Sequence, residues 1–189
     1  MGLASPATTA RATLDDLMNT PGKAELIGGR IVHLMGTGFR PSRVASRILR
    51  SLDDHAEAAG RGFAFNDNLS YAVPELTSGR ESFSPDSSYY DGPPPPDEMD
   101  FISGPPTLAV EVRSKGDYGA AAEAEMAAKR ADYFEAGTLI VWDVDARAQI
   151  IRAYRADAPD RPILFGSSQE ADAESAVPGW RIAVDSIFA

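Results

Sequence analysis

The sequence of 189 residues has no cysteine, only two histidines and no long apolar run. Without cysteine, the chain cannot form disulfide bonds, thiolate metal sites or a cysteine nucleophile. No apolar stretch approaches the roughly 20 residues that span a bilayer, and the first residues lack the apolar core of a signal peptide. Since a cysteine-free chain suits a reducing compartment, we expect a soluble cytoplasmic protein that does not enter a membrane.

Positive charge is also scarce, because 28 acidic residues outnumber 18 basic ones and the net charge is −10. Proteins that bind DNA usually carry a basic surface, so the overall composition argues against tight nonspecific DNA binding. One local exception is a set of arginines spaced to share a stripe of a helix: Arg40, Arg43, Arg47 and Arg50. This stripe is either a solvated helix face or a surface that follows DNA phosphates.

Hydrophobic periodicity predicts a single α/β domain over residues 13–189, after a disordered segment over residues 1–12. The expected elements are helices over 14–22, 42–60 and 117–136, a hairpin over 25–35, extended segments over 63–73 and 81–91, and apolar strands over 107–112, 138–145 and 148–156. Asp117 is expected to cap the third helix and Gly137 to end it. Four consecutive prolines predict a loop over 92–106, and residues 157–189 look less regular, with an edge strand near the end.

Glu111 is a misfit in the apolar segment TLAVEV, which has the pattern of a buried strand. A buried carboxylate costs several kcal/mol unless it is paired or binds a metal. Strand alternation places Glu111 on the same face as Ala109 and Arg113, opposite three apolar side chains. Glu111 is therefore either one half of a neighbour pair with Arg113 or part of a functional site.

Lys129 is a second misfit, because helical spacing places it among residues that suit a core. The other members of this helix face are Ala122, Met126, Tyr133 and Gly137. On this interpretation the lysine points toward the sheet. Alternatively, it extends past apolar surface to solvent and pairs with Glu125, which stands four residues before it.

Asp86 follows Pro85 within the extended segment over 81–91. A Pro-Asp pair alone usually marks a turn, but with Glu111 and Lys129 it completes a set that suits phosphodiester cleavage. Two carboxylates can hold Mg²⁺ or Mn²⁺ and leave positions for water. The metal then activates that water, and a lysine neutralises the charge that develops on the phosphate.

Five segments resemble a known family in order and spacing: AELIGGRIVHL, SPDSSYY, LAVEVRSKGD, AAKRADYFEAG and LIVWDVD. They are similar to the Uma-type restriction endonucleases, a branch of the PD-(D/E)xK nuclease superfamily that is often described as a domain of unknown function. The resemblance implies a restriction-endonuclease-like core, in which a mixed β-sheet is flanked by helices. It also implies that Asp86 and Glu111 are the motif acids and metal ligands, and that Glu25 is an accessory acid.

The resemblance implies a displaced catalytic lysine. In the common motif the lysine lies two residues after the glutamate, where this chain has Arg113. In this branch it stands on the following helix, which implies Lys129, whereas Lys115 lies in the polar turn SKGD and ranks lower. The chain also departs from the family at Ser42, where a histidine often begins the first long helix, and neither histidine of the chain replaces it.

The leading hypothesis is thus a Mg²⁺- or Mn²⁺-dependent endonuclease that hydrolyses DNA. By analogy with nucleases of this fold, it would work as a homodimer, because two strands need two sites. An alternative is a nuclease-fold protein that no longer cleaves and serves as a binding or regulatory module, which the acidic composition and Ser42 favour. A third possibility is a metal-dependent hydrolase of small phosphate esters, which an acidic surface permits.

Overall fold

The computed structural model describes residues 10–189. Residues 1–9, which form most of the segment expected to be disordered, lie outside the described residues. At the end of that segment, the Ala12 N–H donates to the Gly29 carbonyl at 2.9 Å, and Arg11 pairs with Glu75 at 2.8 Å. These two residues therefore contact the rest of the fold.

The central layer is a six-stranded sheet in the order β11-β10-β9-β8-β6-β3. Its strands are β3 (Phe63–Asn66), β6 (Ser87–Tyr90), β8 (Leu108–Val112), β9 (Ile140–Asp145), β10 (Ile150–Arg155) and β11 (Ala158–Phe165). Among these strands only the β8–β9 pair is parallel, and the other neighbours are antiparallel. The expected mixed sheet is confirmed, and β8 lies inside it, as its apolar sequence predicts.

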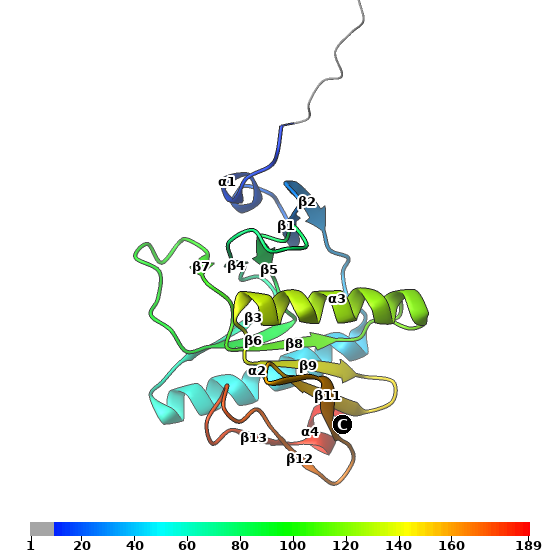
Figure 1. Ribbon diagram of the computed structural model, residues 1–189. Coiled ribbons are helices and arrows are strands. Elements are labelled where there is room, and N and C mark those ends of the chain that lie inside the picture. The colour runs from blue at the N-terminus through cyan, green and yellow to red at the C-terminus, as the bar shows by residue number, and fades with distance from the viewer. Residues whose placement is uncertain (1–9) are drawn as a thin grey trace, which may run out of the picture.

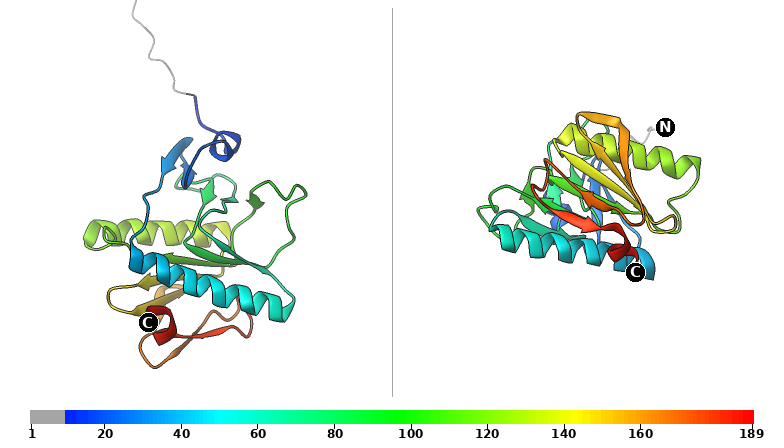
Figure 2. Two further views of the ribbon diagram at one scale, coloured as in Figure 1. Left: turned by 180° about the vertical axis from the view of Figure 1, so that it is seen from behind. Right: turned by 90° about the horizontal axis from the view of Figure 1, so that it is seen from below.

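Two long helices cover opposite faces of this sheet (Figures 1 and 2). Helix α2 (Phe39–Ala59) covers one face and ends at Gly60, whose φ of 61° lies in the left-handed region that glycine favours. Helix α3 (Ala120–Ala136) covers the other face and ends at Gly137, as predicted. Because α3 connects β8 to β9, these two strands can lie side by side in parallel.

Smaller elements extend the two outer layers (Figure 1). On the α3 side lie α1 (Leu14–Met18), the hairpin of β1 (Ala24–Ile27) and β2 (Arg30–His33), and a sheet of β4 (Tyr71–Ala72), β5 (Ser82–Phe83) and β7 (Ile102–Ser103). On the α2 side lie β12 (Glu170–Asp172), β13 (Arg181–Ala183) and α4 (Val184–Phe188). Within residues 10–189, no helix has the length and apolar character needed to cross a membrane.

Alternation along β8 and β9 gives the sheet an apolar face and a polar face. Toward α2, alternate residues join the largest core cluster: Leu108, Val110, Val112, Ile140, Trp142 and Val144. Toward α3, Ala109 and Val141 join a second core cluster with Tyr133, while Glu111, Arg113 and Asp143 form ion pairs. The candidate residues Glu111 and Lys129 therefore meet on the polar face.

Some local expectations are wrong. Asp117 does not cap α3, whose N-cap is Gly119; its carboxylate instead accepts a hydrogen bond from the Ser114 N–H at 2.6 Å and closes the preceding turn. Residues 157–189 are more regular than expected, since β11 is an edge strand of eight residues. The loop expected over 92–106 contains β7, which pairs in parallel with β4.

Candidate active site

A pocket of about 720 Å³ lies on the polar face of the sheet, next to α3 and the β1–β2 hairpin. All four candidate residues line it: Glu25, Asp86, Glu111 and Lys129. They come from β1, from the β5–β6 connection, from β8 and from α3. The fold thus gathers into one cavity four side chains that are widely spaced in the sequence.

Glu111 points from β8 toward α3. Its Oε1 atom lies 2.8 Å from Nζ of Lys129 and accepts a hydrogen bond from the Tyr133 hydroxyl at 2.6 Å. A neighbour pair between Glu111 and Arg113 is the wrong interpretation, because Arg113 donates to Asp143 at 2.7 and 2.6 Å. Helix α3 therefore supplies the partner that the buried carboxylate needs.

Lys129 lies on the side of α3 that packs against the sheet, as its spacing predicts. Its Nζ atom contacts Glu111 and also lies 3.2 Å from Oε1 of Glu25. No ion pair joins Lys129 to Glu125 within the described chain, so the surface-pair interpretation is wrong. The ammonium of Lys129 is held between two carboxylates inside the pocket.

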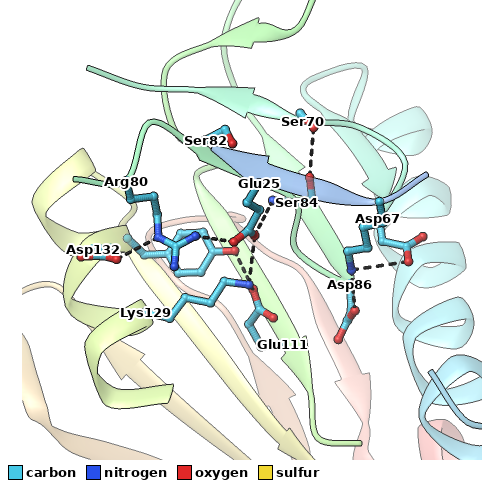
Figure 3. Close-up of polar contacts among 12 residues, drawn as sticks. Glu25, Asp67, Ser70, Arg80, Ser82, Ser84, Asp86, Glu111, Lys129 and Asp132 are labelled. Atoms are coloured by element: carbon cyan, nitrogen blue, oxygen red, sulfur yellow. Dashed lines mark hydrogen bonds and ion pairs between the residues drawn. The ribbon is translucent and has the colours of Figure 1, made fainter. Parts of the chain in front are cut away.

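Glu25 is the most enclosed of the four, with a side chain only 2% exposed. Its Oε1 accepts a hydrogen bond from the Ser84 N–H at 3.0 Å, and its Oε2 pairs with the Arg80 guanidinium. Arg80 in turn donates through Nε to Asp132 at 2.8 Å. A continuous ionic chain therefore runs from Asp132 through Arg80, Glu25 and Lys129 to Glu111, and it ties the hairpin to α3 and β8 (Figure 3).

Asp86 stands where the extended segment expected over 81–91 is broken, between β5 and β6. Pro85 precedes it and has no N–H for a strand ladder, which favours a break there. The Val112 N–H donates to Oδ2 of Asp86 at 2.8 Å, and Nζ of Lys23 lies 3.0 Å from Oδ1. Asp86 is thus fixed against the strand of Glu111 but stands outside the ionic chain of the other three candidates.

Charges in the pocket shift pKa values in opposite directions. Burial raises the pKa of Glu111, and repulsion from Asp86 and Glu25 adds to this against the effect of Lys129. Burial would also raise the pKa of Glu25, but the charges of Lys129 and Arg80 outweigh it and lower that pKa. Burial would lower the pKa of Lys129, but Glu111 and Glu25 raise it. Lys129 is therefore a stable cation, and burial disfavours the ionised form of Glu111.

The resemblance implies a divalent cation, and the donor set of the pocket suits one. Asp86 and Glu111 repel each other strongly enough to contribute to the raised pKa of Glu111, and a cation between them would relieve this repulsion. Mg²⁺ typically uses one or two carboxylates and completes its shell with water. Residues 10–189 contain no cluster of three or more histidine, cysteine, aspartate or glutamate ligands. The resemblance implies that Asp86 and Glu111 would be the side-chain ligands, with water completing the shell.

The arginine stripe of α2 lies away from the ionic chain. Arg40, Arg43 and Arg50 are exposed. Arg47 donates instead to the Ile187 carbonyl at 3.2 Å and so helps to hold the C-terminal helix. Ser42, at the position where the family often has a histidine, is exposed and is not among the pocket-lining residues.

Five charged residues that line the pocket are not singled out by the sequence pattern: Lys23, Arg80, Arg130, Asp132 and Asp143. Lys23 carries a usable signal, because it precedes Glu25 by two residues and alternation places both on one strand face. Asp132 follows Lys129 by three residues, a spacing that puts both on one helix face. Arg80 has no local signal, since its partners come from β1 and α3.

Comparisons with known proteins confirm the family resemblance. The profile of the family described as "Uma2: Putative restriction endonuclease" matches residues 11–185. Among solved structures, the chain is similar to a "putative nuclease belonging to DUF820 from Anabaena variabilis", with a TM-score of 0.71 and 19% sequence identity over 93% of this chain and 97% of that chain. At this identity the likeness shows the fold alone. No curated protein matches the sequence. Because the family profile covers nearly the whole chain, this protein belongs to the Uma2 family of restriction-endonuclease-like proteins.

Proposed function

We propose that this protein is a Mg²⁺- or Mn²⁺-dependent endonuclease that hydrolyses phosphodiester bonds in DNA. Asp86 and Glu111 bind the metal, Lys129 is the catalytic lysine and Glu25 is an accessory acid. The observation that supports this most is the meeting of two carboxylates and an enclosed ammonium in one pocket, with Lys129 2.8 Å from Glu111. The family description supports the class of reaction.

A divalent cation held by Asp86 and Glu111 would lower the pKa of a water and offset charge on the phosphate. The ammonium of Lys129 has three donors, two of which Glu111 at 2.8 Å and Glu25 at 3.2 Å can accept. The third can donate to a phosphate oxygen or orient the attacking water. Because its pKa is raised, Lys129 acts as a fixed positive charge and not as a general base.

Tyr133 and Glu25 act by positioning the groups that meet the substrate. Burial and the charge of Glu111 raise the pKa of Tyr133 well above its usual value, so its hydroxyl stays protonated and donates to Glu111. Glu25 holds Lys129 from the opposite side, and Arg80 keeps Glu25 ionised. Loss of Glu25 would therefore displace the lysine without removing it.

The DNA contact in this proposal is the surface at the start of α2. Thr37 lines the pocket, and two residues further on the exposed ring of Phe39 stands beside the exposed Arg40 and Arg43. Basic side chains bind phosphates, and an exposed aromatic ring can stack on an unpaired base. Arg47 contributes to packing rather than to this surface.

The test measures cleavage of supercoiled plasmid, linear duplex and single-stranded DNA with Mg²⁺ or Mn²⁺. We expect the wild type to cleave at least one of them, and Lys129→Met to lose about 100-fold or more in rate, the usual effect of removing a donor to developing charge. Lys115→Met is the matched control, because it removes the same charge from an exposed turn. Equal rates for the wild type and Lys129→Met would contradict the role of Lys129. A wild type that cleaves none of the three would contradict the proposal itself.

A second candidate function is binding without cleavage. It is favoured by the Lys23 ammonium, which already contacts the proposed ligand Asp86 at 3.0 Å. Calorimetric titration with Mn²⁺ separates the two functions, because a wild type that binds no metal supports the non-cleaving alternative. Turnover of a generic small phosphodiester in place of DNA would instead support a phosphate-ester hydrolase.

We further propose that the protein cleaves duplex DNA as a homodimer. The edge strand β11 has prolines and charges in its first half, which oppose pairing, but its second half exposes Ile163 and Leu164. An exposed apolar stretch of an edge strand can pair with a second copy. Sedimentation velocity with and without duplex DNA tests this, with Leu164→Lys as the variant expected to dissociate the dimer. A monomer that cuts both strands of a duplex would contradict it.

A further inference from the structure

Lys23 is a pocket cation that the proposed chemistry does not use. It immediately precedes β1, and its side chain is only 18% exposed. Its Nζ atom lies 3.0 Å from Oδ1 of Asp86 and 3.5 Å from Oδ2 of Asp67. The ammonium therefore stands between two carboxylates, one in the pocket and one beyond it, both drawn in Figure 3.

These two carboxylates hold the ammonium under different constraints. Asp86 is fixed, because its Oδ2 accepts a hydrogen bond from the Val112 N–H at 2.8 Å. Asp67 lies in the turn between β3 and β4, and its side chain is 42% exposed. Lys23 has a flexible four-carbon stem and is already within ion-pair distance of Asp67. A shift of its Nζ atom from Asp86 toward Asp67 is thus a small movement.

A divalent cation at Asp86 would conflict with the present position of Lys23. Oδ2 already accepts from the Val112 N–H, which is fixed in β8, whereas Oδ1 meets only a flexible side chain and is the oxygen more readily freed for a metal. Oδ1 is also the oxygen that Lys23 contacts. Two cations a few ångströms apart repel, and they do so more strongly in a pocket than in water. The lysine must therefore move when a metal binds.

We propose that Lys23 is an internal counter-ion that occupies Asp86 in the metal-free protein and moves to Asp67 when the metal binds. This inference rests on the proposed function, in that Asp86 and Glu111 are the metal ligands. Without metal, the ammonium compensates the acidic pair. With metal, Asp67 receives the ammonium, so a residue outside the pocket sets how tightly the metal is held.

The test is a double-substitution cycle, measured by calorimetric titration of the DNA-free protein with Mn²⁺. Lys23→Met removes the competitor and should tighten Mn²⁺ binding about tenfold, equivalent to about 1.4 kcal/mol. Asp67→Asn removes the second position of the ammonium and should weaken Mn²⁺ binding about threefold, a coupling of the size expected for residues in direct contact. In the Lys23→Met background, Asp67→Asn should have no effect, because no ammonium remains to be received.

The cycle distinguishes a movement of Lys23 from a direct electrostatic effect of Asp67 on Mn²⁺ affinity. If only the electric field mattered, Asp67→Asn would weaken Mn²⁺ binding by the same factor with and without Lys23, and that result would overturn the proposal. A Lys23→Met variant that binds Mn²⁺ no tighter than the wild type would also overturn it. Lys115→Met is the control for loss of a lysine and should leave the affinity unchanged, since Lys115 is exposed.

Failure of this inference and failure of the proposed function give different results. A wild type that binds Mn²⁺ but shows no coupling between Lys23 and Asp67 retains the metal site and loses the counter-ion role. If the wild type and Lys23→Met both bind no Mn²⁺, both proposals fail. Thermal unfolding without metal checks that each variant is folded, and Lys23→Gln repeats the cycle if the methionine variant does not fold.

Discussion

The two faces of the central sheet hold their helices by different means. Toward α2, the sheet packs against apolar side chains that include Val44, Ile48 and Leu52. Toward α3, the buried residues of the helix are Asp132 and Tyr133, and ion pairs such as the one between Lys129 and Glu111 reach the sheet. The same strands therefore carry the largest core cluster on one side, and on the other a smaller cluster with Ala109, Val141 and Tyr133 next to a layer of ion pairs.

A charged layer is the less stabilising way to attach a helix. A buried ion pair roughly offsets its own desolvation and can often be replaced by apolar residues without loss of stability. Apolar burial, in contrast, stabilises by about 25 cal/mol per Å². Stability alone does not explain the charges beneath α3, and the proposed chemistry does. We expect stability to depend mainly on the α2 face and activity on the α3 face.

The largest effect on stability should come from the apolar face. Trp142 is fully buried, and its ring centroid lies 5.0 Å from that of Trp180. Trp142→Ala should lower the free energy of unfolding by about 3–5 kcal/mol, because it removes buried area and leaves a cavity. Urea unfolding followed by far-UV circular dichroism measures the loss. A loss of less than about 1 kcal/mol, typical of an ordinary point substitution, would contradict the expectation that stability depends mainly on the α2 face.

On the charged face, replacing Arg113 should lower the free energy of unfolding strongly, and a second substitution should restore most of it. Its side chain is only 3% exposed and pairs with the buried Asp143. Arg113→Met should cost about 3 kcal/mol, because the buried Asp143 then keeps only the longer contact with Arg130 at 3.7 Å, and adding Asp143→Leu should recover most of this loss. Urea unfolding of both variants measures the recovery. An undiminished loss in the double variant would show that the ion pair itself stabilises the fold.

Glu111→Gln should change the free energy of unfolding by a smaller amount, and this change should depend on pH. Burial raises its pKa above the usual 4.5 despite the charge of Lys129, so ionised Glu111 destabilises the folded state and proton uptake stabilises it. Glu111→Gln should therefore be more stable than the wild type above the raised pKa, by about 1.4 kcal/mol for each pH unit that separates the folded and unfolded pKa values. The difference should shrink as the pH falls through the raised pKa toward 4.5.

Urea unfolding of the wild type and Glu111→Gln over about pH 4 to 8 measures this difference. Glu25→Gln is the control, because it should change the free energy of unfolding in the opposite direction. The pKa of Glu25 is lowered because Lys129 and Arg80 outweigh burial, so neutralising Glu25 should cost stability at neutral pH. A Glu111→Gln variant whose advantage grew in acid would contradict the expectation that ionised Glu111 destabilises the fold.

The smallest effect should come from an ion pair at the surface. Arg181 is exposed and lies 3.6 Å from Asp172. Arg181→Ala should change the free energy of unfolding by about 0–1 kcal/mol, since water and salt screen such pairs. Urea unfolding measures it alongside Arg113→Met. If Arg181→Ala and Arg113→Met lowered the free energy of unfolding equally, buried and exposed ion pairs would contribute alike to stability.

The centre of the site could be predicted from local periodicity. Glu111 was a charge in an apolar strand, and Lys129 was a charge on the inner face of a helix; the two side chains meet at 2.8 Å. Asp86 and Glu25 came mainly from family resemblance, because a Pro-Asp pair and a glutamate in a hairpin have many ordinary roles. The apolar runs predict an α/β domain, and the mixed sheet is what the family resemblance implies.

The rest of the site depends on contacts between distant segments, which local patterns do not report. Arg80 meets Glu25 and Asp132, which stand 55 and 52 positions away. Strand β11 was missed for another reason. Its sequence contains Pro159 and Pro162, which suggest irregular structure, but an edge strand tolerates proline because one row of its N–H groups has no partner.

The ion pair between Glu25 and Lys129 also has a consequence for synthesis of the chain. The two residues are about 100 positions apart, and a ribosome adds about 5–20 residues per second. Glu25 therefore leaves the ribosome roughly 5–20 s before its partner. During that interval no α3 exists to complete the pocket around Glu111. Nascent chains, and chains that stop before Lys129, should therefore lack the assembled site.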